Sequence, residues 1–184
     1  MIRKPIMVFL GVTVGAGLSL GTARAALSVG DHAPEFTAQA AVGGTQFTFT
    51  LSEALKKGPV VLYFYPKSFT QGCTAEAHNF AEATDRFKSM GATVIGMSND
   101  DIDTQKKFSV LECRNKFAVA ADQGAHVMKQ YDALLRGKTD MADRISYVIT
   151  PDGKVIYAFA GMSPDGHVQN TLEAVQRWKS SAHP

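Results

Sequence analysis

The feature that most constrains the fold is Val60–Tyr65, a run of six apolar, β-prone residues that Pro66 ends. A strand with one face in water alternates apolar and polar side chains, whereas an uninterrupted apolar run is typical of a strand covered on both faces. The run therefore predicts a central strand between two layers. The residues after Pro66 then lie at the carboxyl end of that strand, where ligands and catalytic groups gather in open α/β sheets.

Strand and helix patterns alternate along the rest of the chain. Expected helical segments lie at about 51–57, 74–90, from about 100 to 116, 126–131 and 166–180. Expected strands lie at 47–51, 60–65, 93–97, 117–121, 145–149 and 155–159, with a surface loop at 132–143. The turn residues Pro151, Asp152 and Gly153 separate the last two strands and predict a hairpin. This order predicts the α/β fold class, with a mixed central sheet and helices on both faces.

Residues 1–25 have the three-part plan of a secretory signal peptide. Arg3 and Lys4 are followed by an uncharged apolar stretch, and Ala23-Arg24-Ala25 is a small-x-small cleavage signal. We expect cleavage after Ala25, which leaves a single domain at 26–184 and places it in the bacterial periplasm or outside the cell. The alternative is an uncleaved membrane anchor, because the uncharged stretch is near the minimum length of a span.

Composition excludes several classes of protein. A hydrophobic content of 45% argues against a disordered or collagen-like chain. Two cysteines cannot build a disulfide-dense scaffold or a four-cysteine zinc site, and the five histidines lack metal-ligand spacing, so we expect no metal and no cofactor. Cleavage removes three of 19 basic residues and none of 17 acidic ones, so a formal charge of +2 becomes −1. Neither value indicates a nucleic-acid partner.

Cys73 follows Pro66 by seven residues and lies where the helix at 74–90 is expected to begin. The free amides and the dipole of a helix start favour a thiolate over a thiol. Thr70 is one turn earlier, so its hydroxyl can reach the same small pocket. The alternative is a buried structural cysteine.

Pro66, Thr70 and Cys73 have the spacing Pro-x3-Thr-x2-Cys, which resembles the peroxidatic motif of the peroxiredoxins. Segments that resemble the peroxiredoxin Q (bacterioferritin comigratory protein) branch, or the family as a whole, are 29–36, 63–67, 72–74 with Glu76, 144–149 and 151–154. The similarity runs in order over about residues 28–180. It implies a thioredoxin-like fold and thiol-dependent reduction of hydrogen peroxide and small organic hydroperoxides.

The resemblance also implies roles for the site residues. Cys73 would attack the peroxide and become a sulfenic acid. Arg144 would hold the thiolate and stabilise charge on the reacting oxygens, since a guanidinium is always cationic. The Thr70 hydroxyl would bond to both peroxide and thiolate, and Pro66 would shield the pocket from water. The alternative for Arg144 is a surface charge on a strand.

Cys113 is the second sulfur. One form of the branch carries its resolving cysteine five residues after the first, but here that position is His78; Cys113 matches another form, with the cysteine on a later helix. On a helical wheel Cys113 is about 140° or more from Phe108 and Leu111, so we expect it to face solvent. The hypothesis is a Cys73–Cys113 disulfide in each cycle, reached by local unfolding around both cysteines. An inert core thiol and a permanent structural disulfide are the alternatives.

The resemblance implies a thioredoxin-like electron donor and a monomer. One rival hypothesis is a one-Cys enzyme, in which an external thiol resolves the Cys73 sulfenic acid. The other is a non-catalytic thioredoxin-fold domain that binds a partner or senses redox state. His78 is one helical turn from Cys73, but we expect it to be a packed or surface histidine.

Overall fold

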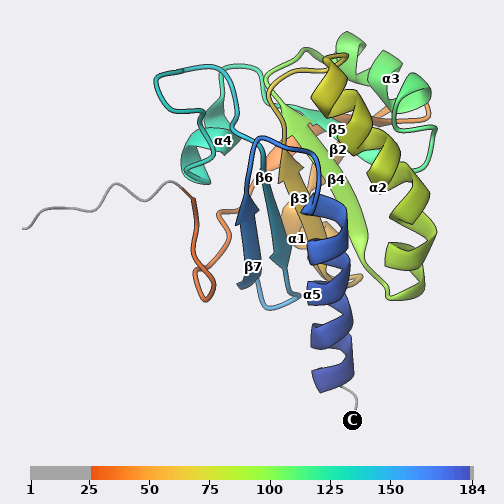
Figure 1. The fold of residues 1–184 in the computed structure, drawn as a ribbon, viewed down its shortest axis with the longest axis vertical. Helices are drawn as coiled ribbons and strands as arrows, with labels where there is room; N and C mark the ends of the chain where they lie inside the picture. Colours follow the sequence, from red (N-terminus) through yellow and green to blue (C-terminus); the bar gives the residue numbers. More distant parts are fainter. Residues whose placement is uncertain (1–25, 183–184) are drawn as a thin grey trace, which may run out of the picture.

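A computed structural model describes residues 26–182, and the signal-peptide prediction for residues 1–25 lies outside this range. Within it the chain forms a seven-stranded mixed sheet in the order β2-β1-β5-β4-β3-β6-β7 (Figure 1). The strands are β1 (Thr37–Val42), β2 (Thr45–Thr50), β3 (Val60–Phe64), β4 (Thr93–Ser98), β5 (Ala118–Ala121), β6 (Ile145–Ile149) and β7 (Val155–Ala160). Strands β3, β4 and β5 run parallel, and β6 is antiparallel to β3.

Strand β3 confirms the prediction of a central strand covered on both faces. All five of its residues are buried. Val60, Leu62 and Phe64 point into one hydrophobic core, whereas Val61 and Tyr63 point into a second core on the opposite face. The period-2 alternation of side chains thus divides one apolar run between two cores.

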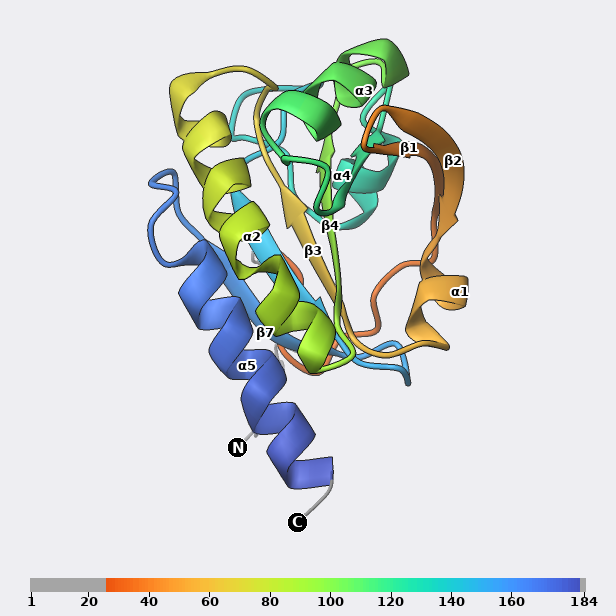
Figure 2. The ribbon, with the colours of Figure 1, turned by 90° about the vertical axis from the view of Figure 1, so that its right-hand side faces the viewer.

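Helices cover both faces of the sheet, as predicted (Figures 1 and 2). They are α1 (Leu51–Leu55), α2 (Gln71–Ser89), α3 (Ile102–Leu111), α4 (His126–Gln130) and α5 (His167–Ala182). Buried residues of α2, α3 and α5 pack into the core that contains Tyr63, and those of α1 and α4 pack into the other. The two ends of the sheet are closed by antiparallel pairs, β1 with β2 and β6 with β7.

Most predicted elements are present with ends shifted by up to three residues, and two differ by more than that. The sequence did not predict β1, because Thr37–Val42 contains three alanines and two polar residues and has no apolar alternation. The helix expected to reach residue 116 ends at Leu111, because Arg114 and Asn115 have positive φ angles of 50° and 60°. Cys113 therefore lies in a turn after α3 rather than on the helix, and this changes its exposure.

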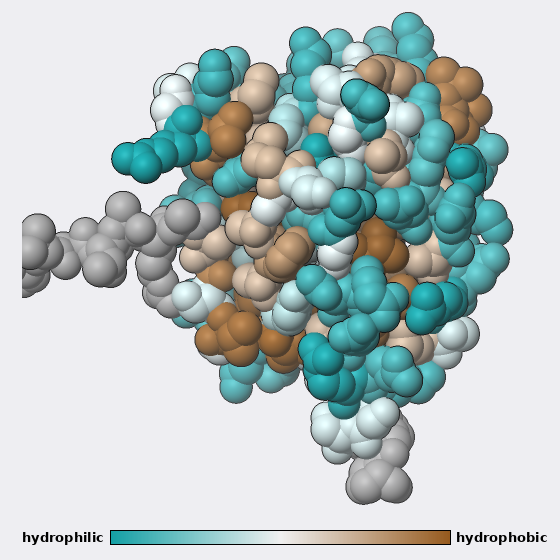
Figure 3. Space-filling view, viewed as in Figure 1, coloured by the Kyte–Doolittle hydropathy of each residue, from teal (hydrophilic) through white to brown (hydrophobic). Residues whose placement is uncertain are grey.

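Figure 3 shows that hydrophilic side chains cover most of the visible face, with apolar side chains in separate small groups. None of the helices within residues 26–182 combines the length and the apolar character that crossing a bilayer requires.

Candidate active site

Cys73 lies in the first turn of α2, at the carboxyl end of β3. Thr70 is the N-cap of the helix, with φ −81° and ψ 150°, so Cys73 is the third helical residue. Backbone N–H groups in the first turn have no partner within a helix and carry the positive end of its dipole. The Cys73 side chain is 2% exposed. The structure thus places a buried sulfur where the backbone favours negative charge.

Arg144 reaches this sulfur from the sheet. It directly precedes β6, and because β6 is antiparallel to β3, the start of β6 lies beside the end of β3, where Phe64 pairs with Ile145. The Arg144 Nη2 donates to Cys73 Sγ at 3.4 Å, and the side chain is 3% exposed. Gly72 makes this approach possible, since a Cβ at that position would lie 3.1 Å from Nη2. Arg144 is therefore a buried cation against the thiol, and the surface-charge alternative is wrong.

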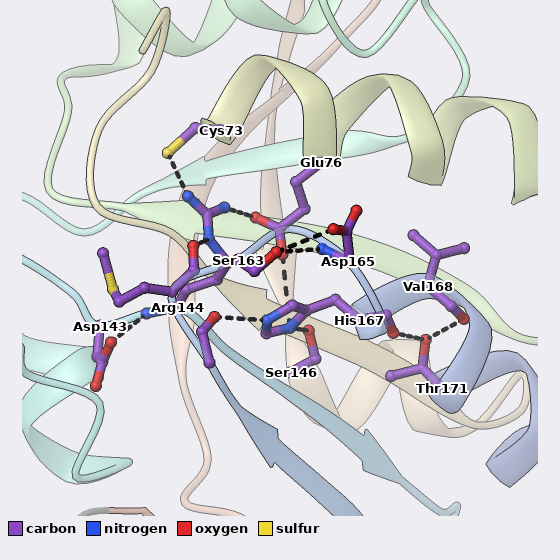
Figure 4. A network of polar contacts seen from close by, with 12 residues as sticks. Cys73, Glu76, Asp143, Arg144, Ser146, Ser163, Asp165, His167, Val168 and Thr171 are labelled. Carbon is purple, nitrogen blue, oxygen red and sulfur yellow. Dashed lines mark hydrogen bonds and ion pairs between the residues drawn. The ribbon is translucent and has the colours of Figure 1, made fainter. Parts of the chain in front are cut away.

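Glu76 is the second partner of Arg144. It lies three residues after Cys73 on α2, and Arg144 Nη1 donates to its Oε2. The Arg144 Nε donates to the Met162 carbonyl at 2.9 Å, so the guanidinium is fixed from three directions (Figure 4). Burial raises the pKa of Glu76 to about 8, although the charge of Arg144 acts to lower it. Burial also opposes the charge of Arg144, but Glu76 and Cys73 beside it raise its pKa.

The loop between β3 and α2 is held by buried polar groups. The Tyr65 hydroxyl donates to Gln105 Oε1 at 2.7 Å and lies 3.2 Å from Ser68 Oγ. The Ser68 amide donates to Asp100 at 2.7 Å. Pro66, at the start of this loop, is partly buried, and Thr70 at its end is exposed and donates its hydroxyl to the Lys67 carbonyl at 3.0 Å. The two predicted residues thus border the site, with Thr70 already engaged by its own loop.

Phe69 connects this loop to α3. It is a non-glycine residue with a φ of 63°, and its side chain is 44% exposed. Its ring packs edge-on against Phe108 at 5.2 Å between centroids. Phe108 in turn accepts a hydrogen bond from the Cys113 amide at 3.0 Å. The Phe69–Phe108 ring contact therefore connects the loop before Cys73 to the residue whose carbonyl binds the Cys113 amide.

Cys113 is fully buried, so the expectation that it faces solvent is wrong. The helical-wheel prediction depended on a helix that continues to residue 116 and on a buried apolar stripe through Phe108 and Leu111. In the structure α3 ends at Leu111, and the Leu111 side chain is 61% exposed, so it does not mark the buried face. Burial, together with the neighbouring Glu112, raises the pKa of the Cys113 thiol well above its ordinary value. Both cysteines are free thiols within the same hydrophobic core.

Three ion pairs fasten the Cys113 turn to α2; we call them the seam. They join His78 to Glu112 (2.7 Å), Glu82 to Arg114 (3.1 Å) and Asp85 to Lys116 (3.2 Å). The three α2 residues are about one helical turn apart, and their partners are every second residue from 112 to 116. His78 therefore pairs with the residue before Cys113, as a partly exposed surface histidine rather than a neighbour of Cys73.

His167 and Ser146 are buried polar residues of this region that the sequence did not single out. His167, at the start of α5, and Ser146, in β6, are both 0% exposed, and their side chains lie 2.8 Å apart. His167 Nε2 lies 2.9 Å from the Gly161 carbonyl, and Nδ1 lies 3.6 Å from Glu76 Oε1. The sequence carried no signal for this contact, because α5 and α2 meet only through tertiary packing.

A buried thiol beside a buried guanidinium suits nucleophilic attack that generates an anion. Within residues 26–182, no group of three or more histidine, cysteine or acidic side chains is arranged to hold a metal ion.

Comparisons with known proteins agree with this chemistry. The chain matches the AhpC/TSA family over residues 29–158. It is 34% identical over 159 residues to a chloroplastic peroxiredoxin Q of Triticum aestivum, covering 86% of this chain and 71% of the relative. It is 32% identical to the chloroplastic peroxiredoxin Q of Populus jackii, and the match covers 84% of this chain and 71% of that relative.

Among solved structures, peroxidoxin BcpB of Mycobacterium tuberculosis is 31% identical, with a TM-score of 0.73 over 81% of this chain and 96% of that one. This neighbour supports the predicted thioredoxin-like fold. The chain therefore belongs to the AhpC/TSA family and is a thiol-dependent peroxidase of the peroxiredoxin Q type.

Proposed function

We propose that Cys73 is the peroxidatic residue and that its substrates are hydrogen peroxide and small organic hydroperoxides. The Cys73 thiolate attacks the terminal oxygen of the peroxide, the S–O bond forms as the O–O bond breaks, and the leaving hydroxide or alkoxide takes up a proton. The sulfur is oxidised to a sulfenic acid, and the peroxide is reduced to water or an alcohol. The observation that carries this assignment is the 3.4 Å contact between Arg144 and Cys73 in a site closed to solvent.

The groups around Cys73 stabilise the thiolate and bind the peroxide. Arg144 stabilises the thiolate before the reaction and the charge on the two oxygens during it. The Cys73 amide, in the first turn of α2, donates to the peroxide, and Pro66 excludes water from one side. Thr70 would have to exchange its bond to the Lys67 carbonyl for bonds to peroxide and thiolate, which calls for a rotation of its side chain.

We propose that Cys113 then resolves the sulfenic acid. Its sulfur displaces the hydroxyl of the Cys73 sulfenic acid, so that a Cys73–Cys113 disulfide forms and water leaves. A thioredoxin-like dithiol reduces this disulfide and returns both thiols. Because both sulfurs are buried and lie on separate elements, the first turn of α2 and the Cys113 turn must open locally before a disulfide with normal geometry can form.

Rapid mixing with peroxide tests the assignment of the two cysteines. Wild type should react far faster than a free thiol, lose two hydrogens in mass and show both thiols blocked. Cys73→Ser should not react, and Cys113→Ser should stop at the sulfenic acid. If Cys73 reacts no faster than a free thiol near neutral pH, the peroxidatic assignment is wrong.

The burial of Cys113 favours a second candidate, a one-Cys cycle in which an external thiol resolves Cys73. A fully buried thiol whose pKa is raised is a poor nucleophile until it is exposed. The same experiment separates the two cycles. Wild type that remains a sulfenic acid until an external thiol is added would support the one-Cys cycle.

We further propose that residues 1–25 are removed as a signal and that the chain acts as a monomer in the periplasm or outside the cell. The support is the charged start, the apolar stretch and the small-residue site before Ala26. Mass spectrometry of the exported protein should give a chain that begins at Ala26. A membrane-bound chain that retains residues 1–25 would support an anchor instead, and sedimentation of the soluble form measures its oligomeric state.

A further inference from the structure

One carboxylate oxygen in the active site has no hydrogen-bond partner. Glu76 is 0% exposed; its Oε2 accepts from Arg144, but its Oε1 accepts from no group within residues 26–182. An unpartnered buried carboxylate oxygen costs free energy, and a proton on the carboxyl group relieves that cost. The nearest basic atom is His167 Nδ1, at 3.6 Å.

The orientation of the His167 ring is fixed by its surroundings. Nε2 faces the Gly161 carbonyl at 2.9 Å, and because a carbonyl only accepts, Nε2 carries a proton. In the neutral ring Nδ1 is therefore the basic atom, and it faces Ser146 Oγ and Glu76 Oε1 (Figure 4). Phe159 packs edge-on against the ring at 4.7 Å and holds it in this position.

The charges of the site do not balance when every acid is ionised. Arg144 is the cation in contact with both Cys73 and Glu76. With Cys73 as thiolate and Glu76 as carboxylate, the buried cluster carries a net charge of −1, and Arg144 divides its attraction between two anions. One proton on Glu76 or His167 makes the cluster neutral and leaves the thiolate as the principal partner of Arg144.

We propose that His167 is a positioning residue that holds one proton jointly with Glu76 behind Arg144. That proton decides whether the guanidinium charge is directed at Cys73 or shared with Glu76. Burial raises the pKa of Glu76 and lowers that of His167, so near neutral pH the proton resides mainly on the carboxyl group. We assign the proton to the pair rather than to Glu76 alone because only 3.6 Å separates His167 Nδ1 from Glu76 Oε1.

Few other charged or titratable groups face the pair. Besides Arg144 and Cys73, two groups interact electrostatically with the pair. The carboxylate of Asp143, which directly precedes Arg144, acts on His167, and the hydroxyl of Tyr63, in β3, lies near Glu76. Asp165, in the segment before α5, is exposed and bonds to Ser163. Strands β6 and β7 otherwise present the Ser146 hydroxyl and the uncharged ring of Phe159.

The inference rests on the proposed role of Cys73 and adds a pH dependence to it. The peroxide rate constant should fall at alkaline pH, when the pair loses its proton and Arg144 turns toward Glu76. This alkaline fall reports the ionisation of the pair.

The test compares two variants by rapid mixing with hydrogen peroxide between pH 5 and 9.5. His167→Gln keeps an N–H for the Gly161 carbonyl but has no basic atom opposite Glu76. Thr171→Val is the matched control, because the buried Thr171 hydroxyl donates to the His167 carbonyl at 2.7 Å and its loss disturbs the same helix start. In His167→Gln the alkaline limb should move about one pH unit lower, so that the rate near pH 8 falls about fivefold while that at pH 6 stays within about twofold. Thr171→Val should reduce thermal stability and leave the alkaline limb in place.

Iodoacetamide alkylation in a Cys113→Ser background gives a readout that needs no peroxide. We expect His167→Gln to slow the alkylation of Cys73 near pH 8, where Arg144 is shared with the ionised Glu76, and to leave the alkylation rate at pH 6 within about twofold of wild type. Should His167→Gln not fold, the ring nitrogens of His167 in wild type, followed by NMR, should change their shifts over the pH range of the alkaline limb.

Four outcomes would overturn the inference: a wild-type rate with no alkaline limb, a rate lowered by one factor at every pH in His167→Gln, an alkylation rate near pH 8 that His167→Gln does not change, or a His167 ring whose NMR shifts do not respond to pH. Failure of the proposed function is different. It would appear as an absence of peroxide reaction in wild type, while alkylation and NMR would still test the proton.

Discussion

If the proposed Cys73–Cys113 disulfide forms in each cycle, the seam that holds the Cys113 turn against α2 should control how fast it forms. Reversing two of its charges, with Arg114→Glu and Lys116→Glu, converts two attractions into repulsions with Glu82 and Asp85. The backbone bonds of the turn stay in place, including those from the Cys113 amide to Phe108 and from the Lys116 amide to Cys113. The double variant should therefore open more often without losing its fold.

The size of the effect follows from the exposure of the pairs. The side chains are 47% and 67% exposed in the Arg114–Glu82 pair and 46% and 73% exposed in the Lys116–Asp85 pair. Exposed pairs contribute about 0.2–1 kcal/mol each. Loss of two such pairs, with repulsion in their place, should favour the open form by about 1–2 kcal/mol, or about five- to thirtyfold.

The assay is a single turnover with one equivalent of peroxide, quenched with acid and a thiol-blocking reagent at successive times and analysed by mass. The sulfenic acid should form at the wild-type rate, and the disulfide should form about five to thirty times faster in the double variant. Lys56→Glu with Lys106→Glu is a control of equal charge change. These lysines form ion pairs with Glu53 and Asp103, each three residues earlier in the chain and outside the seam. Adding Glu82→Arg and Asp85→Lys to the double variant should restore slow resolution.

A double variant that forms the disulfide no faster than wild type, with the control variant also at the wild-type rate, would show that the seam does not limit opening. The same conclusion follows if high salt speeds resolution equally in wild type and in the double variant, since screening should matter only where attractive pairs remain.

Three further predictions concern the site and its core. Arg144→Lys should lower the peroxide rate constant about a hundredfold by rapid mixing, because lysine lacks the fork that directs Nη1 at Glu76 and Nη2 at Cys73; an unchanged rate would remove Arg144 from the mechanism. Gly96→Ala should lower the free energy of unfolding in urea by about 1–3 kcal/mol, since its Cβ would lie 2.6–2.8 Å from the Tyr63 ring, which is stacked on Phe80. Burial raises the pKa of Glu76 from 4.5 to about 8, so its protonated form stabilises the fold and that stability is lost as pH rises from about 4.5 to 8. Glu76→Gln should remove this pH dependence in urea titrations, and equal slopes in the two proteins would contradict it.

The parts of the fold that the sequence predicted are those governed by strong local patterns. The apolar Val60–Tyr65 run ends at Pro66, two apolar strands flank the Asp152–Gly153 turn, and the helix expected at 74–90 coincides with most of α2. Cys73 and Arg144 were correctly placed together through the family resemblance, since nothing local to Arg144 indicates burial. Strand β1 had no such pattern and forms because β2 and β5 pair with both of its edges.

The burial of Cys113 and the contact of His167 with Glu76 could not be predicted, because neither depends on a local pattern. A short reversal at Arg114 and Asn115 turns Cys113 into the core, and both residues are non-glycine residues in a conformation that a sequence seldom signals. On α3, the buried Gln105 bonds to Tyr65 and Ser98, whereas Leu111 is exposed, so hydrophobicity alone selects the wrong face. His167 meets Glu76 across a gap of 91 positions in the chain, which only the folded structure closes.

In the proposed two-Cys cycle, the burial of Cys113 would also determine how this peroxidase is inactivated when peroxide is abundant. Until the turn opens, the sulfenic acid on Cys73 would remain beside Arg144, and a second peroxide could oxidise it to a sulfinic acid that ordinary thiols do not reduce. The fraction of molecules inactivated in each cycle is set by the rate of that second oxidation relative to the rate of opening. A tightly held turn thus limits the protein to low peroxide concentrations, and variants that open faster should survive more turnovers before they are inactivated.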